Sequence, residues 1–86
     1  MARARDEAYD EAALKRLAKA VSGNRKAAGK TQEDLAYEAG VSVRHLQNLE
    51  AGNLNPGYLT LVAIASALFM PVSDLLESAE SRRRSK

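Results

Sequence analysis

Apolar residues recur along the first third of the chain with the spacing of a helix. Leu14, Leu17 and Val21 follow one another at intervals of three or four residues, so their side chains share one helical face. The pattern predicts a helix over about residues 10–28, with Ala28 as a further member of the buried face. A glycine directly after this segment favours the end of a helix there.

The next stretch, residues 31–51, is patterned for two helices with a sharp break at Gly40. Glycine readily takes the positive φ that the end of a helix often requires. If the chain turns at Gly40, the apolar residues of both helices face one interior, which is the plan of a helix-turn-helix. These residues are Leu35, Ala36, Ala39, Val41, Leu46 and Leu49.

Polar residues mark where both of these helices begin. Thr31 followed by Asp34 is a variant of the capping box and predicts a helix that starts at Gln32. Ser42 is placed to cap a third helix, predicted over residues 43–51 and closed by the glycine after it. The capping signals therefore agree with the hydrophobic pattern.

Two more helices follow a loop at residues 53–57, where proline and glycine stop a helix from continuing. The fourth is predicted over about residues 58–69. The fifth is predicted to begin at Pro71, which suits the first position of a helix, and to run to about residue 79. No segment shows the alternation of a strand, so the sequence predicts an all-α fold, a five-helix domain with a helix-turn-helix at its second and third helices.

The predicted helices divide the chain into three parts. Residues 1–9 are expected to be a flexible N-terminal extension, residues 10–80 the helix-turn-helix domain, and residues 81–86 a basic disordered tail. Within the domain, residues 32–51 form the helix-turn-helix and residues 58–79 the predicted dimerisation helices. At 86 residues the chain is near the lower size limit for independent folding, so association with a second copy would add stability.

Composition narrows the possible functions. Without cysteine, and with His45 as the single histidine, the chain lacks disulfides, thiolate chemistry and the usual metal-ligand clusters. No nucleophile with its base, no paired carboxylates in a cleft and no phosphate loop can be assembled. We therefore expect no enzyme, no cofactor, no metal and no evident small-molecule ligand. No apolar run approaches the roughly 20 residues that span a bilayer, and the N-terminus is too charged for a secretory signal, so we expect a cytoplasmic protein with no membrane contact.

The net charge of +2 conceals three zones of different sign. Residues 1–30 carry eight Lys or Arg against four Asp or Glu, residues 31–81 carry only Arg44 against seven acidic residues, and residues 82–86 add four basic ones. A nucleic-acid-binding protein normally presents a basic face. The first helix, with or without the tail, would have to supply most of that charge.

A long set of residues keeps a characteristic spacing between about positions 17 and 76. They are Gln32, Leu35, Ala36, Gly40, Val41, Ser42, Leu46, Leu49, Glu50, Gly52, Asn55, Pro56, Thr60, Leu61, Ile64, Ala65, Ala67, Leu68 and Leu75. Together they resemble the phage lambda-repressor/Cro-type helix-turn-helix family. Within it, the TQEDLAY segment and the small size are most like the controller proteins of restriction–modification systems. The resemblance implies a sequence-specific DNA-binding regulator of transcription, such as a repressor.

The same resemblance implies that the start of the third helix reads DNA bases. The matching positions are Ser42, Val43, Arg44 and Asn48. An arginine such as Arg44 can bond guanine O6 and N7 together, and its alternative role is a phosphate contact. Asn48 suits adenine or remains a surface amide. Val43 stands where the family often has a polar residue, so it would instead touch a thymine methyl group.

Further positions are implied to contact DNA phosphates. They are Gln32, Lys26, Lys30, His45, Asn53 and Asn55. Gln32 begins a helix, where backbone N–H groups already favour an anion. Asn55 has an alternative role as the cap of the next helix. Lys30 departs from the family, which tends to have an apolar residue there.

Arg25 and Glu50 match a family pair that bridges the first and third helices. Such an ion pair would fix the angle at which the third helix is presented, with a small net contribution to stability. The alternative is two unrelated surface charges.

The fourth helix is apolar almost all round. The core positions of the family are matched by Tyr58, Leu61, Ile64, Ala65 and Leu68. On the outer side of this helix, the chain has mostly apolar residues where members of the family usually have polar or small ones. A helix of this kind needs cover on two sides, so we expect a homodimer that reads a pseudo-palindromic operator with its two reading helices about 34 Å apart. The residues expected at this interface are Leu59, Ala63, Ser66, Phe69, Met70, Val72 and Leu76.

Two alternatives remain for this apolar face. The N-terminal extension would cover it within a monomer, or a different protein would bind it. In the second case the chain would be an antitoxin or adaptor-type interaction module of the same fold.

Overall fold

The computed structural model describes residues 10–84, which form five helices and no strand. The helices are α2 (Glu11–Ala27), α3 (Gln32–Ala39), α4 (Val43–Glu50), α5 (Tyr58–Ala67) and α6 (Val72–Arg84). The predicted all-α fold class is confirmed. The predicted N-terminal extension, residues 1–9, lies outside the described residues.

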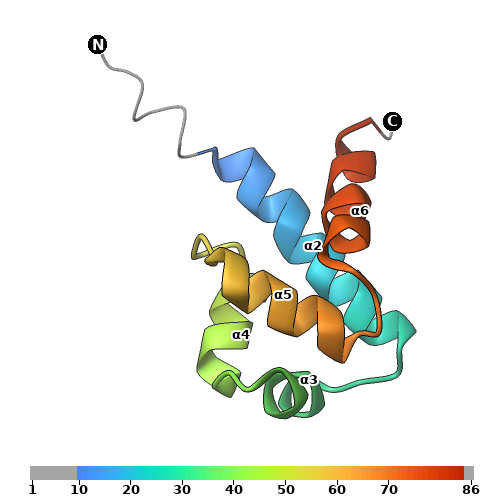
Figure 1. Ribbon diagram of the computed structural model, residues 1–86. Coiled ribbons are helices and arrows are strands. Elements are labelled where there is room, and N and C mark those ends of the chain that lie inside the picture. Colours follow the sequence, from blue (N-terminus) through green and yellow to red (C-terminus); the bar gives the residue numbers. More distant parts are fainter. Residues whose placement is uncertain (1–9, 85–86) are drawn as a thin grey trace.

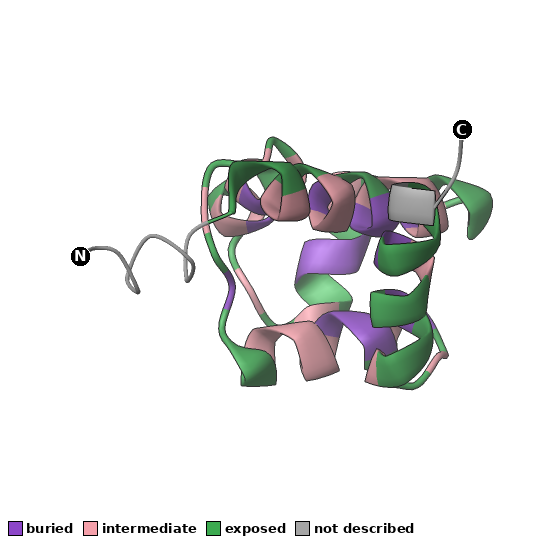
Figure 2. Cartoon of the chain, turned by 90° about the horizontal axis from the view of Figure 1, so that it is seen from above, coloured by how far each residue is buried: buried purple, intermediate pink, exposed green. Residues whose placement is uncertain are grey.

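Figure 1 shows how the helices enclose one core. The short helices α3 and α4 meet at one end of the molecule, α5 packs against α3, and α6 packs against α2 and α5. The buried residues gather where the helices face one another (Figure 2). The largest fully buried side chains are those of Leu35, Leu46, Leu49, Ile64, Leu75 and Val21.

Local capping fixes the ends of α3 and α4 as the sequence predicts. The Thr31 hydroxyl accepts a bond from the Asp34 N–H, and the Asp34 carboxylate accepts one from the Thr31 N–H, both at 3.0 Å. Gly40 ends α3 with φ of 76°, and the Ser42 hydroxyl accepts from the His45 N–H to begin α4. The helix-turn-helix is therefore built from signals within the segment itself.

The capping box also affects ionisation of its carboxyl group. The hydrogen bond from the Thr31 backbone to the Asp34 carboxylate lowers the pKa of Asp34 most. A hydrogen bond with the Thr31 side chain lowers the pKa further. Both bonds favour the charged form of the carboxylate. The box is thus strongest when Asp34 is ionised.

The C-terminal part of the chain is more helical than predicted. Helix α6 continues to Arg84, so the prediction of a disordered tail is wrong for residues 81–84; residues 85 and 86 lie outside the described residues. Ala79, the expected end of this helix, is instead buried against the core. Pro71 stands just before the helix rather than inside it, and its carbonyl accepts from the N–H groups of Asp74 and Leu75.

Several smaller expectations are also corrected. Helix α4 ends at Glu50 and α5 at Ala67, earlier than predicted. Ala28 is exposed because it follows the last residue of α2, where the chain turns away from the core. Tyr58 is 66% exposed rather than in the core, because it opens α5 and has no preceding turn beneath it.

Within residues 10–84, no single helix is both long and apolar enough to cross a membrane. Helices α5 and α6 reach that length and hydropathy only together, and the chain bends by 98° between them.

Candidate nucleic-acid interface

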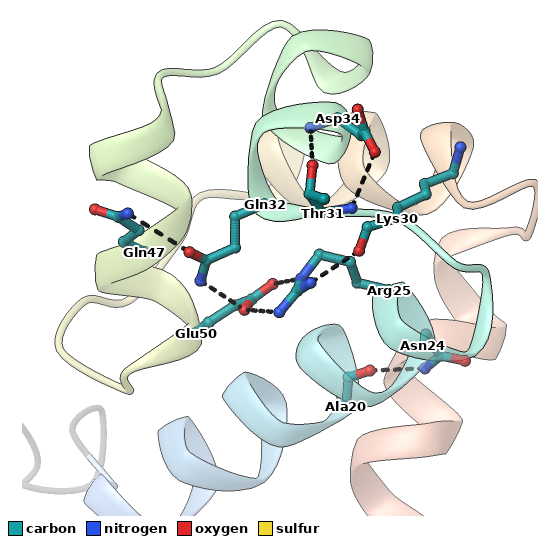
Figure 3. Close-up of polar contacts among 9 residues, drawn as sticks. All are labelled: Ala20, Asn24, Arg25, Lys30, Thr31, Gln32, Asp34, Gln47 and Glu50. Carbon is teal, nitrogen blue, oxygen red and sulfur yellow. Dashed lines mark hydrogen bonds and ion pairs between the residues drawn. The ribbon is translucent and has the colours of Figure 1, made fainter.

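A buried ion pair joins the first described helix to the third. The Arg25 Nε lies 2.8 Å from Glu50 Oε2 and its Nη2 lies 3.0 Å from Oε1, so the two planar groups meet through two bonds. A third bond runs from Arg25 Nη1 to the carbonyl of Lys30 at 2.9 Å (Figure 3). The bond to Glu50 raises the pKa of Arg25, while burial acts against it. The side chains are 11% and 6% exposed, so the pair is largely shielded from water.

Two glutamines extend this pair to α3 and along α4. Gln32 donates from Nε2 to Glu50 Oε1 at 3.0 Å, and Gln47 donates more weakly to Gln32 Oε1 at 3.5 Å. The chain of bonds from Gln47 through Gln32 and Glu50 to Arg25 is called the polar network below. Figure 3 shows that its members come from α2, α3 and α4 and point toward one another. The network therefore ties the reading helix to both neighbours.

Gln47 is the member of this network that the sequence reasoning missed. Position 43, where the family often has a polar residue to bond the first glutamine, holds valine. Gln47 lies one turn further along the same side of α4 and bonds Gln32 instead. The helical spacing of four residues was the available signal.

The predicted base readers differ in how free their side chains are. Arg44 is exposed on α4, and no described residue bonds its guanidinium. Asn48, one turn later, is half-buried. The Ser42 hydroxyl oxygen accepts the capping bond from the His45 N–H, and Val43 packs partly against the core. Arg44 is the member of this set best placed to reach a base edge.

The predicted phosphate contacts differ in how exposed they are. Lys26, Asn53 and Asn55 are exposed and His45 is half-buried. Asn55 does not cap α5, whose N-cap is Gly57 without a side-chain bond.

Two of the predicted phosphate contacts are already bonded within the protein. The Lys30 ammonium lies 2.8 Å from Glu38 Oε1 and 5.8 Å from the centroid of the Phe69 ring. The Gln32 amide bonds Glu50 and Gln47. Both side chains would have to share or exchange partners to bind a phosphate.

The residues of the predicted dimer face are partly exposed and partly half-buried. Leu59 is 79% and Phe69 90% exposed, and Ser66 and Leu76 are also exposed. The others, Ala63, Met70 and Val72, are half-buried. Met70 and Val72 pack against the core, so part of the predicted interface already serves the monomer.

Phe69 has an unusual backbone conformation. It is the non-glycine residue with positive φ in the part of the chain that the structure describes, at 60°. A left-handed conformation costs most side chains roughly 1–2 kcal/mol, and glycine is the residue usually found there. A large aromatic residue therefore occupies a strained position with its ring in solvent.

Residues 24–75 match the model of a protein family described as Helix-turn-helix. This segment covers more than half of the chain and contains the complete polar network. The chain belongs to the helix-turn-helix family. The family is non-enzymatic, in agreement with the expectation from composition.

A curated relative shares the motif over part of its length. The HTH-type transcriptional regulator DdrOP3 of Deinococcus deserti is 44% identical over 48 residues, which are 56% of this chain and 37% of that protein. The chain thus spans little more than a third of the length of this relative.

Solved structures share most of the fold. The restriction-modification controller protein C.AhdI from Aeromonas hydrophila matches with a TM-score of 0.71 and 26% identity, over 72% of this chain and 94% of that one. The clp gene regulator ClgR from Corynebacterium glutamicum matches with a TM-score of 0.76 and 28% identity, over 81% and 91%. The predicted resemblance to helix-turn-helix regulators, controller proteins included, is confirmed.

Proposed function

We propose that this chain is a sequence-specific DNA-binding regulator of transcription that acts in the cytoplasm as a homodimer on a pseudo-palindromic operator. The observation that carries the proposal is the exposed Arg44 on a helix held rigidly by the polar network. Specific reading requires a donor at a fixed place, because a guanidinium bonds guanine O6 and N7 only in one orientation. Arg25 and Glu50 supply that fixity from behind α4.

Three further exposed side chains suit contact with a DNA backbone. The exposed amides of Asn53 and Asn55 follow α4, and the exposed Lys26 lies in the last turn of α2. Contacts of this kind set the orientation of a protein on DNA, while base contacts supply the specificity. The relatives named as regulators support a role in gene control.

The apolar surface of α5 supports the homodimer. Leu59 on α5 and Phe69 just after the helix expose large side chains, and a second copy of the same surface would cover both. A two-fold arrangement would also place two copies of Arg44 on successive turns of DNA.

The proposal is tested by selection from labelled random-sequence duplexes for tight binding. We expect one pseudo-palindromic sequence to be enriched and bound at least about a thousandfold more tightly than bulk DNA. If no sequence exceeds bulk DNA, the regulator proposal is wrong. The exposed α5 face then favours the second candidate, an antitoxin or adaptor-type module that binds another protein.

Sedimentation tests the dimer separately. The wild-type chain should sediment as a dimer and Phe69→Glu as a monomer, because a buried carboxylate would be strongly unfavourable at the interface. Ser73→Glu, an equal change in charge at an exposed position outside the predicted interface, is the matched control and should remain dimeric. An unchanged mass for Phe69→Glu would refute this interface.

A further inference from the structure

Four basic side chains from two helices line a cavity apart from the residues proposed to read DNA. Lys15, Arg16 and Lys19 of α2 and Arg82 of α6 surround an open volume of about 310 Å³. Helices α2 and α6 pack against each other, and the N-terminal end of α2 and the C-terminal end of α6 diverge from this contact toward the top of Figure 1. None of the four forms an ion pair or hydrogen bond with its side chain to another described residue. Positive charges that lie close together repel one another, so a bound anion would relieve the repulsion.

The position of Arg82 depends on a glycine in the facing helix. Asn24 Nδ2 donates to Ser78 Oγ at 3.2 Å, which holds α6 against α2. One turn further along α6, the Arg82 Nη2 lies 2.9 Å from the place where a Cβ on Gly23 would stand. Glycine inside a helix is less favourable than alanine. Its presence here leaves room for the guanidinium to lie against α2.

The chemistry of the four groups selects phosphate among anions. Arg16 and Arg82 each offer a planar fork of donors that matches two phosphate oxygens, and Lys15 and Lys19 add compact charges. The volume is at the lower end of that of ligand pockets, which suits a phosphodiester or a short polyphosphate. We propose that this cavity, called the α2–α6 site, binds phosphate groups, supplied either by a DNA backbone or by a free polyphosphate. The site goes beyond the proposed function because it requires no base reading.

Lys15 brings the α2–α6 site close to the segment that follows the reading helix. The Lys15 Cγ lies 3.4 Å from the place of a Cβ on Gly52, which comes two residues after the end of α4. The following loop carries the exposed Asn53 and Asn55. A phosphate bound beside Lys15 would therefore lie near the loop that we propose to contact DNA.

Thermal unfolding of the full chain with sodium tripolyphosphate, at constant ionic strength, tests the site without DNA. We expect saturable stabilisation of about 4 °C or more in the wild type, because a ligand that binds the folded state raises the midpoint. The double variant Lys19→Gln/Arg82→Gln should bind at least about tenfold more weakly, since two charge-assisted bonds are lost. Ser73→Glu, which lowers the net charge by one at an exposed position of α6 outside the cavity, is the control and should keep wild-type affinity. If tripolyphosphate stabilises all three proteins equally, or without saturation, the proposed site is wrong.

Gly23→Ala separates ligand binding from stability. Without ligand, this variant should unfold at a higher temperature than the wild type, because alanine favours the helix. Its tripolyphosphate affinity should nevertheless fall about threefold or more, because the new methyl group displaces the Arg82 guanidinium. Unchanged affinity with the higher midpoint would overturn the role assigned to Arg82 and Gly23.

The salt dependence of binding to a random-sequence duplex distinguishes the two sources of phosphate. If the DNA backbone occupies the site, the double variant should show a slope of log affinity against log salt that is about two units shallower than that of the wild type. If tripolyphosphate binding is lost in the variant while the slope is unchanged, the source is a free polyphosphate. Absence of a preferred operator would refute base reading and would leave the tripolyphosphate result intact.

Discussion

The α3–α4 unit and the outer face of α5 satisfy their side chains in opposite ways. In the first, caps and the polar network give partners to the groups at the helix ends and in the interior. In the second, Leu59 of α5 and Phe69 just after the helix expose most of their surface, and Gly57, the N-cap of α5, makes no side-chain bond. One region is complete within the monomer, and the other is incomplete without a partner.

The difference teaches which constraints act on each region. The α3–α4 unit has to present Arg44 in one orientation, so its neighbours are fixed by directional bonds. The α5 face has only to exclude water, which apolar surface does without directional bonds. The rigid presentation of Arg44 and the apolar surface for association therefore lie on different helices.

Removing Glu50 should cause the largest effect on the rigid region. Glu50→Ala leaves the buried Arg25 guanidinium without its carboxylate, which should lower the free energy of unfolding by about 3–5 kcal/mol. Urea denaturation measures the change. The double variant Arg25→Met/Glu50→Leu should recover most of this loss, because it removes both charges and keeps apolar packing. If the single variant is as stable as the wild type, the network does not hold α4.

Arg44→Ala tests whether the rigid region reads bases. We expect the best operator to be bound about 1–3 kcal/mol more weakly, with relaxed preference at one or two base pairs. Competition binding with single-base operator variants measures both effects. Equal weakening on operator and random DNA would make Arg44 a phosphate contact instead.

Phe69→Gly tests whether the α5 face trades monomer stability for association. Glycine removes the cost of the left-handed conformation, so the free energy of unfolding of the monomer should rise by about 1–2 kcal/mol. The dimer should dissociate more readily because the exposed ring is lost, by about tenfold or more in the dissociation constant. Denaturation at low protein concentration and sedimentation over a concentration series separate the two quantities. A less stable monomer would show that the ring packs within its own chain.

The pH dependence of the capping box should be the smallest effect. The pKa of Asp34 is lower in the folded state, so its stabilising contribution is complete above the ordinary pKa of an aspartate. It is lost as the pH falls through the lowered value. Asp34→Asn should therefore be less stable than the wild type at neutral pH, and the difference should shrink in acid. A difference that stays constant down to acid pH would contradict a role for the ionised carboxylate.

Most of the fold could be predicted because its signals are local. The Thr31 capping box and the helix end at Gly40 each depend on residues within a few positions of one another. The end of α6 could not be predicted in this way, since packing of α6 against α2 outweighs the polar composition of residues 81–84. The exposure of Tyr58 was not predicted for a related reason. Hydrophobic periodicity shows which residues share one face of a helix, but it does not show how much of that face other helices cover.

The candidate site was predicted less completely than the fold. Arg44 is exposed on the predicted helix, and the Arg25–Glu50 pair is present in the structure. The pairing of Lys30 with Glu38 and the use of the Gln32 amide by Glu50 were not predicted. Spacing along a helix shows which side chains share a face, but it does not show which partner a flexible polar side chain selects.

The sequence by itself determined that residues 31–51 form two capped helices around a glycine turn, because hydrogen bonds within a few residues specify those ends. Only the tertiary structure decided how these helices are held and where charge collects. The polar network joins residues from helices that are distant in the chain, and so does the close approach of Arg82 to Gly23. Their geometry follows from how whole helices pack, because a side chain can bond only the groups that packing brings within reach.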